Sequence, residues 1–281
     1  MTDNRLTAII PTHNRLDLLT RALESVQGQS VTVEVIVVDD GSDPALSARD
    51  LPSGVSLLRS EVPRGPAAAR NVGAAAAKTQ WVGFLDDDDL WLPGKAESVL
   101  EAAVRFPEAN VVFHGSAFQP STRNKGLRML DDPLMRVTRQ QPPHISGVCV
   151  RRQIHDDVQF DETMWATQDL DYLIRLAYVP NWVEIRHDLS RLGDAGLEDS
   201  AISIESRIEG RLSLLDRHGD LIRGDPVAHS FFYVRLGYQY RRGGRYADAR
   251  SSFLRAIKLR PTSALAWRGL IRVLFAASPV Q

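Results

Sequence analysis

The first 115 residues alternate between two hydrophobic patterns, and this alternation constrains the fold more than any other feature of the sequence. Apolar runs of strand length lie at residues 6–11, 31–40, 54–59, 81–86 and 110–115. Between them, the three- and four-residue apolar spacing of an amphipathic helix occupies residues 15–27, 65–78 and 93–106. Strands that alternate with helices predict an α/β fold with a mainly parallel sheet between layers of helices. A further short helix is expected after the turn at 41–44.

Length and composition limit the class of protein. The chain has 281 residues, of which 43% are hydrophobic, and this allows one large domain or one domain with a smaller companion. A single cysteine, Cys149, excludes an intramolecular disulfide and any multi-cysteine metal site, and we expect it in the core. No segment reaches the ~20 apolar residues of a membrane span. We therefore expect a cytoplasmic protein, with contact at the inner face of the membrane as a further option.

Charge divides the chain into an acidic body and a basic tail. Residues 1–200 hold 20 Lys and Arg against 29 Asp and Glu, whereas residues 201–281 hold 14 against 6. Regular periodicity is lost over residues 115–143, which we expect to form a mobile rim of the functional site. The division predicts a body at 1–197, with halves of about 1–114 and 115–197, and a small all-α region at 198–281.

One helix–turn–helix in the tail, at about residues 230–263, resembles a tetratricopeptide repeat. The matching positions are Tyr233, Leu236, Gly237, Tyr240, Ala249, Phe253, Ala256 and Pro261. A single repeat cannot bury its own apolar face, so we expect it to pack on the body or to form a homodimer. The positive charge favours an anionic acceptor or a membrane surface, and nucleic acid is not expected because the arginines are scattered over several helices.

Two acidic clusters follow predicted strands. Asp86 to Asp89 stand in "VGFLDDDDLW", and Asp39 and Asp40 end the run at 31–40. The carboxyl ends of parallel strands meet at one sheet edge, where α/β proteins bind ligands. Clustered carboxylates repel one another, and Mg²⁺ and Mn²⁺ prefer oxygen ligands. The sequence therefore predicts a metal–diphosphate site at this edge.

Four stretches together resemble the inverting family 2 glycosyltransferases, which have the GT-A fold. These are "AIIPTHNRLDLLTRALESVQGQ", "EVIVVDDGS", "RGPAAARNVGAAAA" and "WVGFLDDDDLWLPGK", in this order. The resemblance covers residues 6–100 and continues more weakly to about 190. It implies a hexosyltransferase-type enzyme that takes a sugar from a nucleotide-sugar, with UDP as the expected nucleotide, and that uses Mn²⁺ or Mg²⁺.

The resemblance also implies roles for residues at the donor site. Asp88 and Asp86 match the family's D-x-D motif. Asp88 is expected to bind the metal, and Asp86 is expected to contact the ribose or a water on the ion. The other expected nucleotide contacts are Pro11, Thr12, Asp40, Arg70 and Asn71. For Arg70 and Asn71, a surface arginine and an amide that fixes the helix are equally good interpretations.

Inversion at the sugar carbon needs a base on the face opposite the leaving group. The family places this base in an acidic pair before a helix, and Asp169 occupies the matching position. Gln168 stands where the family usually has Glu, so acceptor contacts there are uncertain. Asp169 also fits a helix start capped by Thr167. Trp165 is a candidate acceptor contact or a core residue, and His187 is a candidate contact to the diphosphate or metal.

Three classes of function remain open from the sequence. The first is a metal-dependent inverting glycosyltransferase in glycan or polysaccharide biosynthesis, acting on a glycan, lipid-linked or peptide acceptor. The second is a sugar-phosphate nucleotidyltransferase, which usually carries a Gly-rich basic loop where this chain has "PTHNR". The third is an interaction protein in which the tetratricopeptide-like tail works and the transferase body is inactive.

Overall fold

The computed structural model describes residues 5–117, 126–193 and 203–276. The chain divides into two compact units. The first contains residues 1–133, 143–163 and 169–199, and the second contains 134–142, 164–168 and 200–281. Among the described residues, no helix combines the length and apolar character needed to cross a bilayer.

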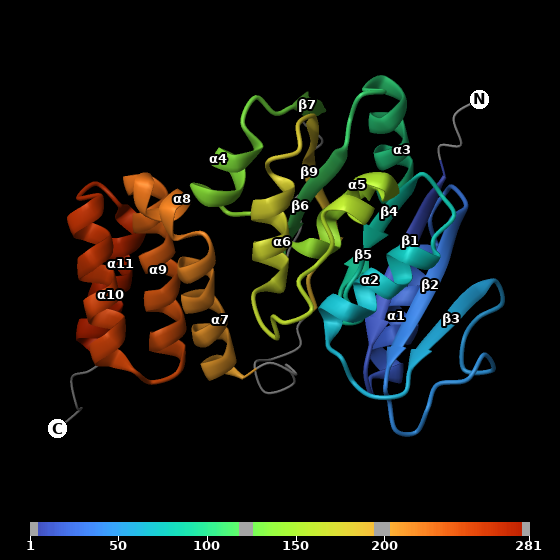
Figure 1. Ribbon diagram of the computed structural model, residues 1–281, viewed down its shortest axis with the longest axis horizontal. Coiled ribbons are helices and arrows are strands. Elements are labelled where there is room, and N and C mark those ends of the chain that lie inside the picture. The colour runs from blue at the N-terminus through green and yellow to red at the C-terminus, as the bar shows by residue number, and fades with distance from the viewer. Residues whose placement is uncertain (1–4, 118–125, 194–202, 277–281) are drawn as a thin grey trace. The chain divides into compact units, whose positions relative to one another are not determined.

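A nine-stranded sheet forms the frame of the first unit (Figure 1). Its strands are β1 (Leu6–Thr12), β2 (Val33–Asp40), β3 (Val55–Ser60), β4 (Trp81–Phe84), β5 (Leu90–Trp91), β6 (Val111–Ala117), β7 (Leu127–Met129), β8 (Val148–Arg151) and β9 (Trp182–Arg191). The order is β3-β2-β1-β4-β8-β6-β9-β5, and β7 pairs with β9. Strands β1 to β4 pair in parallel, as do β6 and β9, whereas β8 runs antiparallel between β4 and β6. The predicted α/β class with a mostly parallel sheet is confirmed.

Alternate residues of the strands face opposite helical layers. Leu6, Ala8 and Ile10 of β1 share a core with α1 (Leu16–Gln27) and α3 (Lys95–Arg105). On the other face, α2 (Pro66–Ala76) lies close to the sheet because Gly73 has no side chain. A Cβ at Gly73 would lie 2.5 Å from Cγ2 of Ile9. The predicted layers on both faces of the sheet are therefore present.

Four short helical elements lie between residues 133 and 176. They are α4 (Pro133–Thr138), a 3₁₀ turn η1 (Ile145–Gly147), α5 (Arg152–Asp157) and α6 (Gln168–Leu176). Tyr172 of α6 stacks on Phe160, with ring centroids 4.0 Å apart and an interplanar angle of 19°. This stacking fixes α6 to the segment that precedes it.

Two expectations about local structure were wrong in part. The short helix expected after residues 41–44 is absent, since residues 45–54 form turns and extended backbone. Residues 115–143 are not a continuous irregular loop, because β7 and α4 lie within them. Elements this short contain too few residues to show a periodicity. Residues 118–125 lie outside the described residues, and the predicted mobility of this rim stays a prediction.

The second unit contains a series of helices. They are α7 (Ile204–Arg217), α8 (Gly219–Gly224), α9 (Pro226–Arg242), α10 (Tyr246–Leu259) and α11 (Ala264–Ala276). Phe253 of α10 is fully buried against glycines of both neighbouring helices. A Cβ at Gly237 of α9 would lie 2.9 Å from its ring, and one at Gly269 of α11 would lie 2.2 Å away. The predicted helical tail is confirmed, and its assignment to the tetratricopeptide class stays a prediction.

Candidate active site

The four aspartates form a tight turn between β4 and β5. After Phe84 ends β4, the amide of Leu85 still donates to the carbonyl of Ile9 in β1 at 3.0 Å. The turn is closed by the amide of Asp89, which donates to the carbonyl of Asp86 at 3.0 Å. The run therefore stands at the carboxyl edge of the parallel strands, as the sequence predicts.

The first two carboxylates have partners from β1, the segment after it and α2. Arg70 donates from Nη2 to Asp86 at 2.5 Å. Thr12, the last residue of β1, donates its hydroxyl to Asp87 at 2.8 Å, and Arg15 lies 3.3 Å from the other Asp87 oxygen. Burial acts to raise the pKa of Asp86, but the charges of Arg70 and of a nearby histidine outweigh it and lower the pKa.

The fourth carboxylate, Asp89, is buried and fully engaged. It accepts from the hydroxyl of Ser146 at 2.6 Å and from the amide of Gly193 at 2.9 Å. Nδ1 of His144 lies 3.2 Å from the same carboxylate. Because the Ser146 hydroxyl also accepts from the amide of Asp86 at 3.1 Å, this serine fastens both ends of the aspartate turn.

A buried lysine, Lys95, contacts the backbone of the same serine. Lys95 has no exposed surface, and its ammonium donates to the Ser146 carbonyl at 2.8 Å. It also lies 3.9 Å from the centre of the Trp91 ring. The hydroxyl of Ser190 donates to the same carbonyl at 3.0 Å. Burial lowers the pKa of Lys95 to about 8, although nearby negative charge opposes the shift.

Asp88 is the carboxylate with the weakest partner. Among the described residues, its contact with an opposite charge is Arg15 at 3.6 Å, and 27% of its side chain is exposed. Burial and the negative charges of Asp86, Asp89 and Asp87 raise its pKa to about 7. A cation beside Asp88 would therefore stabilise its ionised form.

The donor set fits a hard divalent metal. One ligand atom each of Asp86, Asp89 and His144 lies within 4.8 Å of the others. Burial lowers the pKa of His144, but its hydrogen bond to Asp89 and the charges of Asp89, Asp86 and Asp169 outweigh this and raise the pKa to about 9. In the absence of a metal, His144 therefore pairs with Asp89 as a counter-ion. Asp88 lies close enough to Asp86, Asp89 and Asp87 for their negative charges to raise its pKa, so its carboxylate belongs to the same cluster.

The protein itself supplies much of the positive charge that the aspartate run requires. Arg70 faces Asp86, Arg15 faces Asp87 and Asp88, and His144 faces Asp89. The sequence alone does not show these partners, because they come from distant segments. The prediction from the clustered carboxylates therefore overestimated how much of the positive charge a metal must supply.

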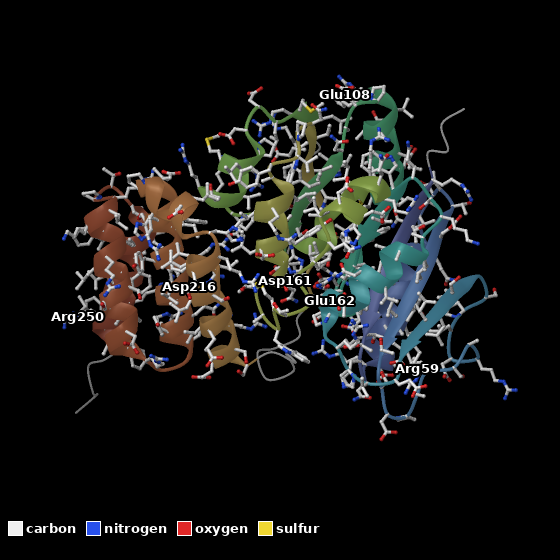
Figure 2. The ribbon with its side chains drawn as sticks, in the orientation of Figure 1. Arg59, Glu108, Asp161, Glu162, Asp216 and Arg250 are labelled. Carbon is white, nitrogen blue, oxygen red and sulfur yellow. The ribbon has the colours of Figure 1, made fainter. Side chains whose placement is uncertain are left out.

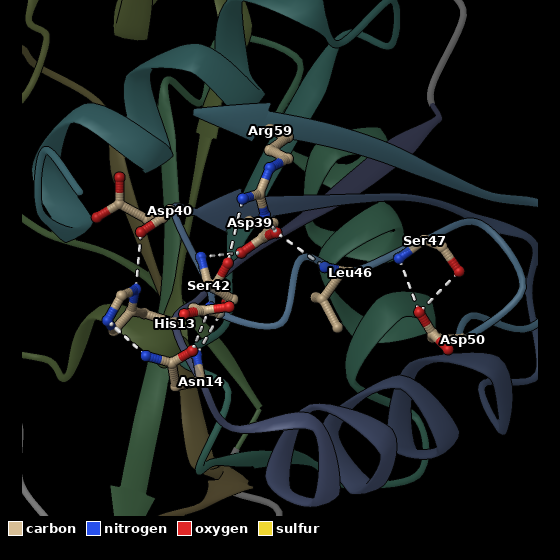
Figure 3. Close-up of polar contacts among 10 residues, drawn as sticks. His13, Asn14, Asp39, Asp40, Ser42, Leu46, Ser47, Asp50 and Arg59 are labelled. Atoms are coloured by element: carbon tan, nitrogen blue, oxygen red, sulfur yellow. Dashed lines mark hydrogen bonds and ion pairs between the residues drawn. The ribbon is translucent and has the colours of Figure 1, made fainter. Parts of the chain in front are cut away.

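The second acidic pair lies at the end of β2 and holds the backbone around it (Figure 3). Asp40 accepts from the amides of Arg64 at 2.9 Å and Gly65 at 2.7 Å. These bonds shape the loop before α2, where Gly65 has a φ of 89° that suits glycine. Nδ1 of His13 lies 2.8 Å from the Asp40 carbonyl oxygen.

Asp39 explains why no helix follows β2. Its buried carboxylate accepts from the amides of Ser42 at 2.9 Å and Leu46 at 3.2 Å, and it pairs with Arg59 (Figure 3). Burial acts to raise the pKa of Asp39, but these hydrogen bonds outweigh it and lower the pKa. The chain is drawn back onto the aspartate instead of continuing as a helix.

The two neighbouring residues of α2 have different surroundings. Arg70 is buried and lies 5.3 Å from the centre of the Phe160 ring, on the side of the aspartate turn. Asn71 clamps Phe160 by accepting from its amide at 2.9 Å and donating to its carbonyl at 3.0 Å. It also donates to Glu162, labelled in Figure 2, at 3.0 Å. Asn71 therefore fixes the chain that leads toward α6, which leaves little of its amide for a nucleotide.

Asp169 lies half-buried in the first turn of α6. Its negative charge contributes to the raised pKa of His144, so it lies near the aspartate turn. Thr167 does not have the extended conformation of an N-cap: its φ is 60°, and its hydroxyl donates to the Ala166 carbonyl at 2.6 Å. A β-branched residue in this conformation is strained. Trp165 is 63% exposed and Gln168 is buried, and both belong to the second unit.

His187 lies in the middle of β9. Its charge acts on the buried His114 of β6, whose pKa is lowered chiefly by burial. Nδ1 of His187 is buried and has no hydrogen-bond partner among the described residues. No contact of His187 with the aspartate turn is found in the described part of the chain.

Sequence reasoning missed four residues of this site, namely Arg15, Lys95, His144 and Ser146. Arg15 and Lys95 stand inside the motifs that were recognised, but their side-chain partners are remote in sequence. His144 and Ser146 precede β8, and only the insertion of β8 between β4 and β6 brings them to the aspartates. No local pattern in the sequence indicates that insertion.

Comparison with known proteins identifies the family of this chain. A family model described as "Glycosyl transferase family 2" matches residues 7–157, more than half of the chain. An uncharacterized glycosyltransferase of Haemophilus influenzae is 36% identical over 131 residues, which are 46% of this chain and 44% of the relative. The pre-mycofactocin glycosyltransferase of Mycobacterium tuberculosis is 32% identical over 185 residues, which are 61% of this chain and 38% of the relative. The chain thus spans less than half the length of these relatives.

Solved structures share the fold. The crystal structure of Staphylococcus aureus TarS 1–349 superposes with a TM-score of 0.58 at 18% identity, covering 97% of this chain and 90% of that fragment. The same protein in complex with UDP-GlcNAc gives a TM-score of 0.53 at 20% identity, covering 88% and 90%. The matched family model, the aspartate turn at the sheet edge and the shared architecture agree: this chain belongs to glycosyl transferase family 2 and has the GT-A fold.

Proposed function

We propose that the protein transfers a sugar from a UDP-sugar to an acceptor hydroxyl, with inversion and with a divalent metal, Mn²⁺ or Mg²⁺. The observation that carries this proposal is the environment of Asp88. Its carboxylate stands beside Asp86 at the sheet edge, has a raised pKa, and among the described residues has Arg15 at 3.6 Å as its cationic partner. A UDP-GlcNAc complex of the structurally similar TarS supports a UDP-linked donor.

The residues of the first unit would divide the work on the donor. Pro11 and Thr12 end β1 beside the aspartate turn, where the base and ribose would lie, and Asp40 would accept a hydrogen bond from the base. Asp86 and Asp88 would hold the metal, which when bound stabilises the negative charge that develops on the leaving diphosphate. The hydrogen bond from Arg70 to Asp86 would hold the guanidinium close to this charge.

Asp169 is proposed as the base that takes the proton from the acceptor hydroxyl. Its position at the start of α6, near enough to act on the pKa of His144, supports this role. Trp165 is exposed and remains a candidate to stack on an acceptor sugar, and the buried Gln168 remains a candidate acceptor contact. A relative named for succinoglycan biosynthesis, 40% identical over 102 residues, supports an acceptor in polysaccharide biosynthesis.

A donor panel tests this function. We expect UDP-sugars, but not GDP- or dTDP-sugars, to raise the melting temperature in the presence of Mn²⁺, and we expect mass spectrometry to detect slow release of UDP. EDTA should abolish both effects. A nucleotidyltransferase would instead release pyrophosphate from a nucleoside triphosphate, and an inactive body would bind no donor at all. Either result would overturn the proposal.

A further inference from the structure

Helix α11 has a second apolar face whose side chains are about half exposed or more, and Trp267 on this face donates its indole N–H to the Pro261 carbonyl at 2.9 Å. Its buried face packs on α10 through Ala266, Leu270 and Val273. Another set of apolar side chains follows the spacing i, i+4, i+7 and i+8, which places them on one side of the helix. Their exposed fractions are 47% for Trp267, 49% for Ile271, 48% for Leu274 and 79% for Phe275. We call these four residues the α11 stripe.

Positive charge borders the α11 stripe. Arg268 and Arg272 each follow a stripe residue directly, so they lie along one edge of it, and both are exposed. From α9 to α11, residues 226–276 hold ten Lys and Arg but one acidic residue, Asp248. Asp248 is itself paired with Arg245 at 2.7 Å. The α11 stripe therefore lies in a strongly basic group of helices, α9 to α11.

This charge decides between possible occupants of the stripe. A second copy of the chain that docked here would bring its basic helices α9 to α11 against the same basic helices of the first copy, and like charges repel. An anionic lipid surface accepts apolar side chains and attracts arginines at the same time. Arginine suits the boundary between acyl chains and head groups because it has an apolar stem and a charged end, and the Trp267 ring supplies apolar surface there. The bases are also distributed over three helices, which suits a fluid surface more than one fixed partner.

We propose that the α11 stripe and its bordering arginines dock the protein on an anionic membrane surface. The side chains would enter the head-group region while the helix stays packed on α10 through its buried face. This proposal is independent of the proposed transferase activity, since it rests on residues of the second unit alone.

Vesicle co-sedimentation of the full chain tests the proposal. We expect partition onto phosphatidylcholine vesicles that contain phosphatidylglycerol, little partition onto phosphatidylcholine alone, and loss of binding in high salt. Each basic residue near an anionic surface contributes about fivefold, so Arg268→Gln with Arg272→Gln should weaken partition by roughly 25-fold. Ile271→Ser with Phe275→Ser should weaken it at least as much.

Matched variants separate this effect from general surface changes. Val62→Ser with Val104→Ser removes two apolar side chains that are 64% and 67% exposed in the first unit, and Arg21→Gln with Arg49→Gln removes two exposed arginines there. Both should bind vesicles like the parent. Circular dichroism should show that every variant is folded.

Three outcomes would overturn the proposal. They are no partition onto anionic vesicles, equal partition onto neutral vesicles, and equal losses in the first-unit control variants. Light scattering distinguishes the remaining occupants. If the parent is a dimer, binds no vesicles and becomes a monomer with Ile271→Ser and Phe275→Ser, the stripe is an interface between two copies.

Discussion

Replacing Lys95 by methionine should stabilise the protein at neutral pH, although it removes two contacts. The substitution keeps an unbranched side chain of similar length and removes a fully buried charge. The Ser146 carbonyl loses the ammonium at 2.8 Å but keeps the Ser190 hydroxyl at 3.0 Å. No buried acceptor is therefore left without a donor.

The magnitude follows from the pKa. Burial lowers the pKa of Lys95 from 10.5 to about 8. At 1.36 kcal/mol per pKa unit, the charged form costs the folded state about 3 kcal/mol. The ring of Trp91, 3.9 Å away, returns up to ~2 kcal/mol through a cation–π interaction. We expect Lys95→Met to raise the free energy of unfolding by about 1–3 kcal/mol, as replacements of buried charges often do.

The dependence on pH makes this prediction specific. Between pH 8 and 10.5 the unfolded chain keeps the Lys95 proton that the folded chain has lost, so the parent gains stability as the pH rises. The advantage of Lys95→Met is therefore complete below pH 8 and disappears toward pH 10.5. Urea unfolding at several pH values measures it, with the exposed Lys78→Met as a control. A less stable variant below pH 8, or a difference that does not change with pH, would refute the reasoning.

The remaining predictions concern the site. Asp88→Ala should abolish Mn²⁺-dependent UDP binding in calorimetry with little change in melting temperature, and unchanged binding in EDTA would exclude a metal at this aspartate. Asp169→Asn should lower turnover by roughly 10²–10⁴-fold with UDP affinity retained; normal turnover would reduce Asp169 to a helix-start residue. Gly210→Ala would place a Cβ 2.6 Å from the Ala166 carbonyl oxygen, and the displaced segment before Asp169 should cost about 10²-fold in turnover. Gly224→Ala, whose Cβ meets nothing within 4 Å, should leave turnover unchanged, and equal rates in the two variants would contradict this account.

The fold was predictable where the pattern was long and local. The apolar runs that became β1, β2 and β4 differ from the helical spacing of α1 and α3, so the layers and the sheet edge followed from periodicity. The short β7 and α4 were missed because a few residues carry no period. The helix expected after the turn at 41–44 was wrong because Asp39, an apparently functional acid, holds the amides of Ser42 and Leu46.

The location of the candidate site was predictable from the sequence, but the contacts between its side chains were not. Parallel strands bring Thr12, Asp40 and Asp86 to one edge, and a motif with this spacing indicates the chemistry expected there. The contacts of His144 and Ser146 with Asp89 depend on β8 running antiparallel between two parallel strands. That arrangement is long-range, and a single sequence contains no record of it.

The four adjacent aspartates show why identical letters can have unlike roles. Asp86 is paired with an arginine, Asp87 accepts from a threonine, and Asp89 is locked by a serine, a backbone amide and a histidine. Against the effect of burial, the charges of Arg70 and His144 lower the pKa of Asp86, whereas burial raises the pKa of Asp87 despite its hydrogen bonds with Thr12 and Arg15. Asp88 has Arg15 at 3.6 Å and a pKa raised to about 7, so its ionisation near neutral pH depends on what binds beside it. In the proposed function Asp86 shares the metal with Asp88, while the contacts of Asp87 and Asp89 hold the turn in place.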